Sequence, residues 1–171
     1  MAKRIVKRGD PKITKRWIRN RSDELAVAND CWFDEASGRF VINWIQGYCK
    51  LYEGEYAGQP MELRDWQYEC TMRLFGWQRW SERWGRAIRR FREAVVFVAK
   101  KGKKSPTLAA WGLYLLCGDG EQGAKCFLAA KDGMQARDIA GKHAIEMLRQ
   151  SPELLAECSV NKSTMQITHE R

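Results

Sequence analysis

Histidines, closely paired cysteines and long apolar runs are scarce in this sequence of 171 residues. No apolar run approaches the roughly 20 residues that a membrane helix needs. The six cysteines include no C-x-x-C pair, and only His143 and His169 could join them, so a zinc site has little to draw on. The charged start has no apolar stretch behind it, so we expect no secretory signal, reduced thiols and an intracellular protein without membrane contact.

Apolar and aromatic residues are abundant instead. Hydrophobic residues make up 44% of the chain and aromatic residues 11%, with eight tryptophans, which is too apolar for a disordered chain. At this length we expect one compact domain with an appendage.

Positive charge is concentrated in two segments. Residues 1–22 contain nine Lys or Arg and one Asp, and residues 78–104 contain ten Lys or Arg and two Glu, within a total net charge of +9. Two basic segments on an otherwise acidic chain indicate local contacts with phosphates or nucleic acid. The alternative is a solvated tail and a solvated helix face.

The hydrophobic pattern predicts a helical part followed by an α/β part. Residues 1–12 form a basic flexible arm, 13–77 a helical segment and 78–171 the α/β part. Apolar spacing of three and four residues predicts helices over 13–28, 40–48, 62–74, 106–116 and 134–149. The continuous apolar run at 94–99 is typical of a strand buried in a parallel sheet, 125–130 is expected to form a second buried strand, and a last strand is expected at 163–168.

The junction between the run at 94–99 and the next helix carries the strongest chemical signal. Lys104-Ser105 follows a basic loop and precedes Pro106, which is tolerated in a first helical turn. A loop that wraps phosphates uses backbone N–H groups, one Lys and a Ser/Thr hydroxyl that holds magnesium. The pattern departs from G-x-x-x-x-G-K-[ST], because Val98 and Lys103 stand at the positions of its two glycines. A basic strand-to-helix loop without a ligand is the alternative.

A second candidate feature is Trp66-Gln67. The Gln amide can donate to and accept from the edge of adenine, and a neighbouring aromatic ring can stack on it. The alternative is a helix that buries Trp66 and leaves Gln67 solvated.

Taken together, several motifs resemble the large subunit of tailed-bacteriophage terminase, a DNA-packaging motor. The residues that carry this resemblance are Gly58-Gln59-Pro60, Leu63, Trp66-Gln67, Leu74-Phe75-Gly76-Trp77, Arg90-Phe91-Arg92, 96–101, 104–110, Ala129-Ala130-Lys131 and Gln135-Ala136-Arg137. The resemblance implies an α/β fold in which an N-terminal helical segment precedes the first part of a P-loop NTPase parallel sheet.

The resemblance also implies roles for particular residues. Gln67 matches the glutamine that reads adenine, with Trp66 beside it, and Ser105 matches the hydroxyl that holds magnesium. The implied ATP-binding loop comprises Lys100, Lys101, Gly102, Lys103, Lys104 and Ser105. The implied partners are double-stranded DNA, the terminase small subunit, the portal protein and further copies of the motor, in the cytoplasm of the host cell.

Two departures from the family's pattern stand out. Lys103 occupies a position where the family usually has Gly. The family's apolar strand ending in Asp-Glu, which activates water, does not follow the loop here, so the catalytic carboxylate is unknown and we expect this chain alone to be inactive as an ATPase.

Two other functions remain open from the sequence. A basic DNA-binding accessory protein would use the arm and the Arg-rich segment, with Trp77, Trp80 and Trp84 stacking on bases. A different P-loop enzyme, such as a kinase, fits the loop but not the Trp-Gln pair.

Overall fold

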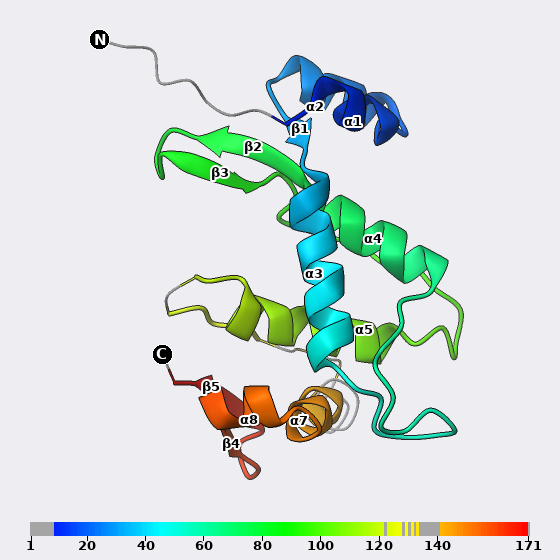
Figure 1. Cartoon of the computed structure of the whole chain (residues 1–171), viewed down its shortest axis with the longest axis vertical. Coiled ribbons are helices and arrows are strands. Elements are labelled where there is room, and N and C mark those ends of the chain that lie inside the picture. Colours follow the sequence, from blue (N-terminus) through cyan, green and yellow to red (C-terminus); the bar gives the residue numbers. More distant parts are fainter. Residues whose placement is uncertain are drawn as a thin grey trace. The chain divides into compact units, whose positions relative to one another are not determined.

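The computed structural model describes residues 9–121, 123–127, 129, 131, 133 and 141–170 (Figure 1). The chain forms two compact units, Met1–Ile42 with Arg64–Val96, and Asn43–Leu63 with Phe97–Arg171. The segment boundaries expected at residues 12 and 77 stay predictions, and most of the basic arm lies outside the described residues. Within the described residues, no helix combines the length and apolar character needed to cross a membrane.

Four helices contribute to the first unit: α1 (Pro11–Arg16), α2 (Arg21–Ala28), the start of α3 (Glu35–Tyr48) and α4 (Asp65–Gly76). The single helix expected over 13–28 is therefore two helices. The side-chain oxygen of Asn20 accepts the Asp23 backbone N–H at 3.1 Å and caps α2, which separates it from α1. Helix α3 passes through Gly38, where an added Cβ would lie 2.9 Å from Met72 Sδ.

An antiparallel sheet completes the first unit, with strands β1 (Trp32–Phe33), β2 (Trp77–Ser81) and β3 (Arg86–Arg89) in the order β1-β2-β3. Phe33 and Trp77 are fully buried and meet edge to face, with ring centroids 5.7 Å apart. Trp17 stacks on Phe33 with ring centroids 4.3 Å apart. A Cβ at Gly76 would lie 2.5 Å from the Phe33 ring, so glycine permits this close aromatic packing.

A buried carboxylate ties the helices of the first unit to the segment after β3. The Asp23 side chain, 1% exposed, is 2.9 Å from Arg73 and 2.8 Å from Arg90, and also accepts the Arg19 backbone N–H at 3.0 Å. Burial alone would raise the pKa of Asp23, but the hydrogen bonds from Arg90, Arg19 and Arg73 outweigh it and lower that pKa below 3.8.

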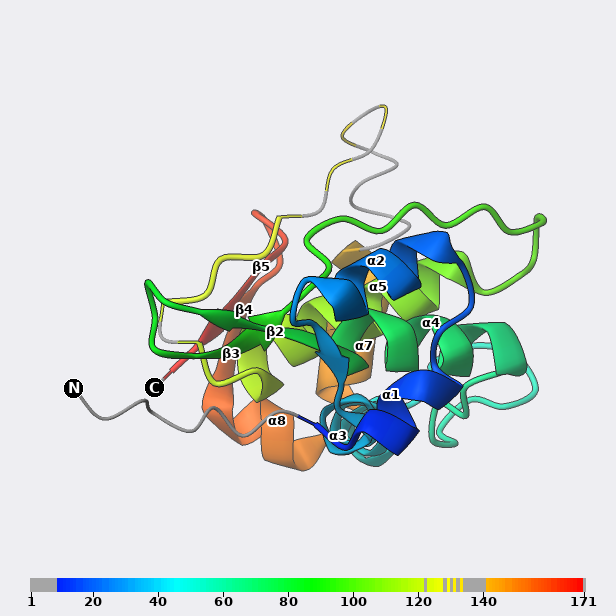
Figure 2. The same cartoon turned by 90° about the horizontal axis from the view of Figure 1, so that it is seen from above.

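The second unit contains α5 (Lys104–Leu113), the π-helical turn η1 (Tyr114–Gly118), α7 (Lys142–Arg149), α8 (Pro152–Glu157) and the hairpin of β4 (Cys158–Asn161) and β5 (Gln166–His169) (Figure 2). Helices α5 and α7 pack against each other. The ring of Trp44, from the end of α3, meets Tyr114 edge to face, with centroids 5.6 Å apart. The strand expected at 163–168 is confirmed as β5, shifted toward the C-terminus.

The expected parallel sheet is absent from the described part of the chain, where both sheets are antiparallel. The run at 94–99 belongs to no strand, and Val95 and Phe97 are 77% and 93% exposed. The described residues of 125–130 are likewise outside any strand, and Phe127 is 88% exposed. A buried strand needs hydrogen-bonding neighbours on both sides. Strand β5, a potential neighbour, pairs with β4 instead.

Candidate functional site

The loop before α5 folds into a tight turn. The backbone N–H of Gly102 donates to the carbonyl oxygen of Ala99 at 3.1 Å and closes this turn. A Cβ at Gly102 would lie 2.4 Å from Val98 Cγ1 and 3.0 Å from the Ala99 carbonyl oxygen. Glycine is therefore required here because the turn has no room for a side chain.

Two lysines of this loop adopt the left-handed backbone conformation. The φ angle is +68° at Lys101 and +59° at Lys103, a region that costs an L-residue other than glycine roughly 1–2 kcal/mol. Lys103, at the N-cap of α5, occupies the position where the resemblance predicts glycine, and its backbone has the conformation that glycine favours. Left-handed residues within a loop turn successive N–H groups toward one side, which is the geometry of an anion-binding nest.

Lys104 and Ser105 are the first two residues of α5, and Ser105 is half-buried. Lys104 Nζ donates to the carbonyl oxygen of Val98 at 2.8 Å, so its ammonium group folds back over the turn. Thr107 Oγ1 donates to the carbonyl oxygen of Lys103 at 2.8 Å and holds the turn against the helix. Both residues that the sequence proposes for phosphate and magnesium therefore lie at the N-terminus of α5.

Positive charge accumulates at this helix end. The four lysines at positions 100, 101, 103 and 104 join the positive end of the α5 dipole, and the first turn contains no acidic residue. Lys103 Nζ also lies 5.6 Å from the centroid of the Tyr56 ring, a cation–π contact. The combination of a helix N-terminus, left-handed loop residues and four cations suits an anion such as a phosphate.

The predicted adenine-reading pair belongs to the first unit, whereas the lysine loop belongs to the second. Gln67 is fully buried, so the alternative of a solvated glutamine is wrong. Its side-chain oxygen accepts the Arg64 backbone N–H at 2.8 Å, and its carbonyl oxygen accepts the Thr71 hydroxyl at 2.6 Å. Trp66 is half-buried beside it in α4. The observed bonds show Gln67 anchoring the first turn of α4, and adenine recognition stays a prediction.

The Arg- and Trp-rich segment is divided between core and surface. Trp77 is fully buried and cannot stack on a base, while Trp84, beyond the end of β2, is 61% exposed, with the Arg83 guanidinium 5.1 Å from its ring centroid. The Arg90 guanidinium forms an ion pair with Asp23. These placements reduce the set of Arg and Trp side chains that a nucleic acid could contact.

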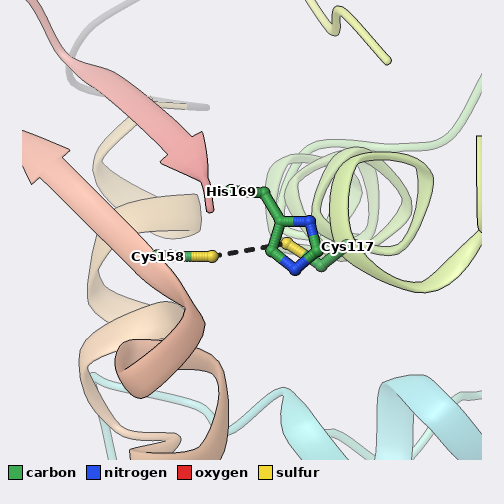
Figure 3. A group of neighbouring side chains, drawn as sticks. All are labelled: Cys117, Cys158 and His169. Carbon is green, nitrogen blue, oxygen red and sulfur yellow. Dashed lines mark hydrogen bonds between the residues drawn. The ribbon is translucent and has the colours of Figure 1, made fainter. Parts of the chain in front are cut away.

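The structure also brings together three residues that the sequence analysis does not combine. Cys117 in η1, Cys158 in β4 and His169 in β5 each place one potential metal-ligating atom within 4.8 Å of the other two (Figure 3). Burial raises the pKa of the Cys158 thiol, although its hydrogen bond with Cys117 opposes this shift. No short sequence motif predicts this cluster, because its three residues come from separate segments of the chain.

No family model matches the sequence, and no curated protein matches it. Among solved structures, the chain matches the crystal structure of the HK97 bacteriophage large terminase, with a TM-score of 0.61 and 20% sequence identity. The match covers 77% of this chain and 25% of the terminase chain. The chain therefore has the fold of part of a phage large terminase, and it spans about a quarter of that protein's length.

Proposed function

We propose that this chain is an ATP-binding portion of a terminase-type motor that moves viral DNA into a procapsid. The observation that carries the proposal is the lysine-rich turn at the N-terminus of α5, in a chain with the fold of part of a phage large terminase. The fold supports a terminase-related role, and the chemistry of the turn supports phosphate as the ligand.

In this proposal the loop binds the phosphates of ATP. Lys104 Nζ breaks its hydrogen bond to the Val98 carbonyl oxygen and binds the β- and γ-phosphates instead. The Ser105 hydroxyl holds Mg²⁺. Backbone N–H groups beside Lys101 and Lys103 contact phosphate oxygens, and the surrounding lysines neutralise charge. Gln67 and Trp66 are proposed to contact adenine. When bound, Mg²⁺ would neutralise part of the charge on the phosphates, and Ser105 is the residue that would hold it.

The remaining partners are proposals of the same kind. Double-stranded DNA is the expected polyanion for the basic segments at 1–22 and 78–104, because phosphate contacts by Lys and Arg release counterions. A terminase small subunit, a portal protein and further copies of the motor are the proposed protein partners. The host cytoplasm is the proposed location.

Calorimetry with Mg·ATP tests the nucleotide site. A charged hydrogen bond contributes about 1.5–3 kcal/mol, so Lys104→Ala should weaken binding by roughly 10- to 100-fold. Lys162→Ala is the matched control, because it removes the same charge from the exposed turn between β4 and β5. The control should bind ATP as the unmodified chain does.

The same titrations discriminate between the functions considered. Equal ATP affinity for the unmodified chain and Lys104→Ala would remove Lys104 from the site. DNA binding by the unmodified chain without measurable ATP binding would indicate a DNA-binding accessory protein instead. Transfer of phosphate to an added acceptor would indicate a kinase.

A further inference from the structure

The C-terminal hairpin places two metal-ligand residues directly opposite each other. Cys158 and His169 are register partners at the open end of the β4–β5 pair. Directly opposite residues of an antiparallel pair have Cβ atoms about 4.5–5.5 Å apart, so their side chains can reach a common centre. The backbone N–H of Glu170 donates to the carbonyl oxygen of Glu157 at 2.8 Å and holds this end of the hairpin closed.

The third residue arrives from a local irregularity after α5. The turn η1 is π-helical, and the N–H of Asp119 donates to the carbonyl oxygen of Tyr114, five residues earlier, at 2.9 Å. Such turns occur frequently at functional sites, because the wider turn redirects side chains. Figure 3 shows Cys117 from this turn, Cys158 and His169 gathered at one point. Cys117 and Cys158 are 5% and 8% exposed.

The separation of the two sulfur atoms matches a tetrahedral metal centre. Two sulfur ligands, each about 2.3 Å from a zinc ion, are about 3.8 Å apart at the tetrahedral angle. The Cys117 and Cys158 Sγ atoms are 3.7 Å apart, whereas a disulfide bond would bring them to about 2.05 Å. A simple S–H···S hydrogen bond would also give this separation, but it does not require an imidazole nitrogen within 4.8 Å of both sulfurs.

A carboxylate supports the imidazole. Glu157 Oε2 lies 3.2 Å from His169 Nε2, and the His169 side chain is 7% exposed. A carboxylate on one ring nitrogen of a metal-binding His orients the ring and increases the basicity of the other nitrogen. Glu157 is therefore a positioning residue in this arrangement, and a metal would bind the second ring nitrogen.

We propose that Cys117, Cys158 and His169 form a binding site for a thiophilic divalent cation, with Zn²⁺ as the expected ion. Two thiolates and one imidazole are soft and borderline ligands that favour zinc over magnesium or calcium. The fourth tetrahedral position is filled by water or another exogenous ligand. The bound ion links η1 to the C-terminal hairpin, two parts of the second unit whose cysteines are 41 residues apart in sequence. This site is independent of the proposed nucleotide loop.

Cobalt substitution in the full, reduced chain tests the proposal. Co²⁺ should produce a thiolate-to-cobalt charge-transfer band and the visible bands of a tetrahedral centre, saturating at one ion per chain, and Zn²⁺ should displace it. Cys117→Ser, Cys158→Ser and His169→Ala should each lose this spectrum or weaken binding by at least 10-fold. Cys126→Ser, at an exposed cysteine, is the matched control and should keep the full spectrum.

Glu157→Gln keeps all three ligands and provides a second test that does not disturb a buried residue. Loss of an outer-shell partner typically lowers metal affinity 10- to 100-fold, so this variant should bind Co²⁺ more weakly with the same spectrum at saturation. Zn²⁺ should also raise the midpoint of thermal unfolding of the unmodified chain, and not that of His169→Ala. No cobalt–thiolate band in the reduced chain, or a band that survives both Cys117→Ser and His169→Ala, would overturn the proposal.

Discussion

Replacing Asp23 with asparagine should cause a large loss of stability. The substitution keeps the size of the side chain and removes its charge. Arg73 and Arg90 then lose the carboxylate that lies 2.9 and 2.8 Å from their guanidinium groups. Removing one partner of a buried ion pair typically costs about 3–5 kcal/mol, because the other charge stays buried without compensation.

The exposure of the two arginines sets the expected magnitude. Their side chains keep 20% and 13% of their surface exposed, so water partly compensates for the lost carboxylate. We therefore expect Asp23→Asn to lower the free energy of unfolding by about 3 kcal/mol, the lower end of that range. Total stabilities of about 5–15 kcal/mol are typical, so such a loss is easily measured.

Urea unfolding at pH 7, followed by circular dichroism and tryptophan fluorescence, measures this loss. Glu24→Gln is the matched control, because it makes the same acid-to-amide change at the next residue of α2, which is exposed. The control should stay within about 0.5 kcal/mol of the unmodified chain. A loss below about 1 kcal/mol for Asp23→Asn would refute the reasoning.

The direction of the pKa shift predicts how this difference changes with pH. The pKa of Asp23 is lowered from 3.8 in the folded chain, so the unfolded chain binds a proton more readily. The stabilisation is complete above pH 3.8 and is lost as the pH falls through the lower, folded value. The difference between the unmodified chain and Asp23→Asn should therefore shrink on acidification below about pH 4.

Three further changes test other parts of the structure. Lys103→Gly should strengthen ATP binding in calorimetry, because φ at this position is +59° and glycine opens the backbone to phosphate; unchanged or weaker binding would show that the lysine does not obstruct the loop. Burial lowers the pKa of His143 below 6.5, more than Glu53 raises it, so the neutral ring favours the folded state. Stability should therefore fall as the pH drops below 6.5, by at most about 1.4 kcal/mol per pH unit, and His143→Gln should flatten this dependence in urea unfolding at pH 5–7. Deleting residues 1–12 removes five of the nine basic side chains of 1–22. If about half of those five contact phosphates, the slope of log K against log salt for duplex DNA should flatten by about 2; an unchanged slope would indicate a solvated tail.

The helices could largely be predicted from the sequence. Apolar spacing predicts this helix at 62–74, and the structure has α4 at Asp65–Gly76. Such features depend on contacts within a few residues, which the local pattern records. The apolar spacing over 13–28 does not reveal the break between α1 and α2. That break depends on the side chain of Asn20, which caps α2 and interrupts the helix that the spacing predicts.

The position of Lys104 and Ser105 at a helix N-terminus could also be predicted from the sequence, because it depends only on where the next helix begins. The sequence could not show that Lys103 takes a left-handed backbone, or that Gly102 lies where Val98 leaves no room for a side chain. The buried position of Gln67 also depends on packing around α4 and not on its neighbours in sequence.

By itself, the sequence determined the helical periodicity, the loop composition and the basic segments, because each is a property of neighbouring residues. Only the tertiary structure decided strand partners: β2 pairs with β3 and β4 with β5, while the most apolar run, at 94–99, lies outside both sheets. Hydrophobicity favours burial but does not specify which strand supplies the hydrogen bonds. The same holds for Cys117, Cys158 and His169, which meet because a π-helical turn and a hairpin register bring them together.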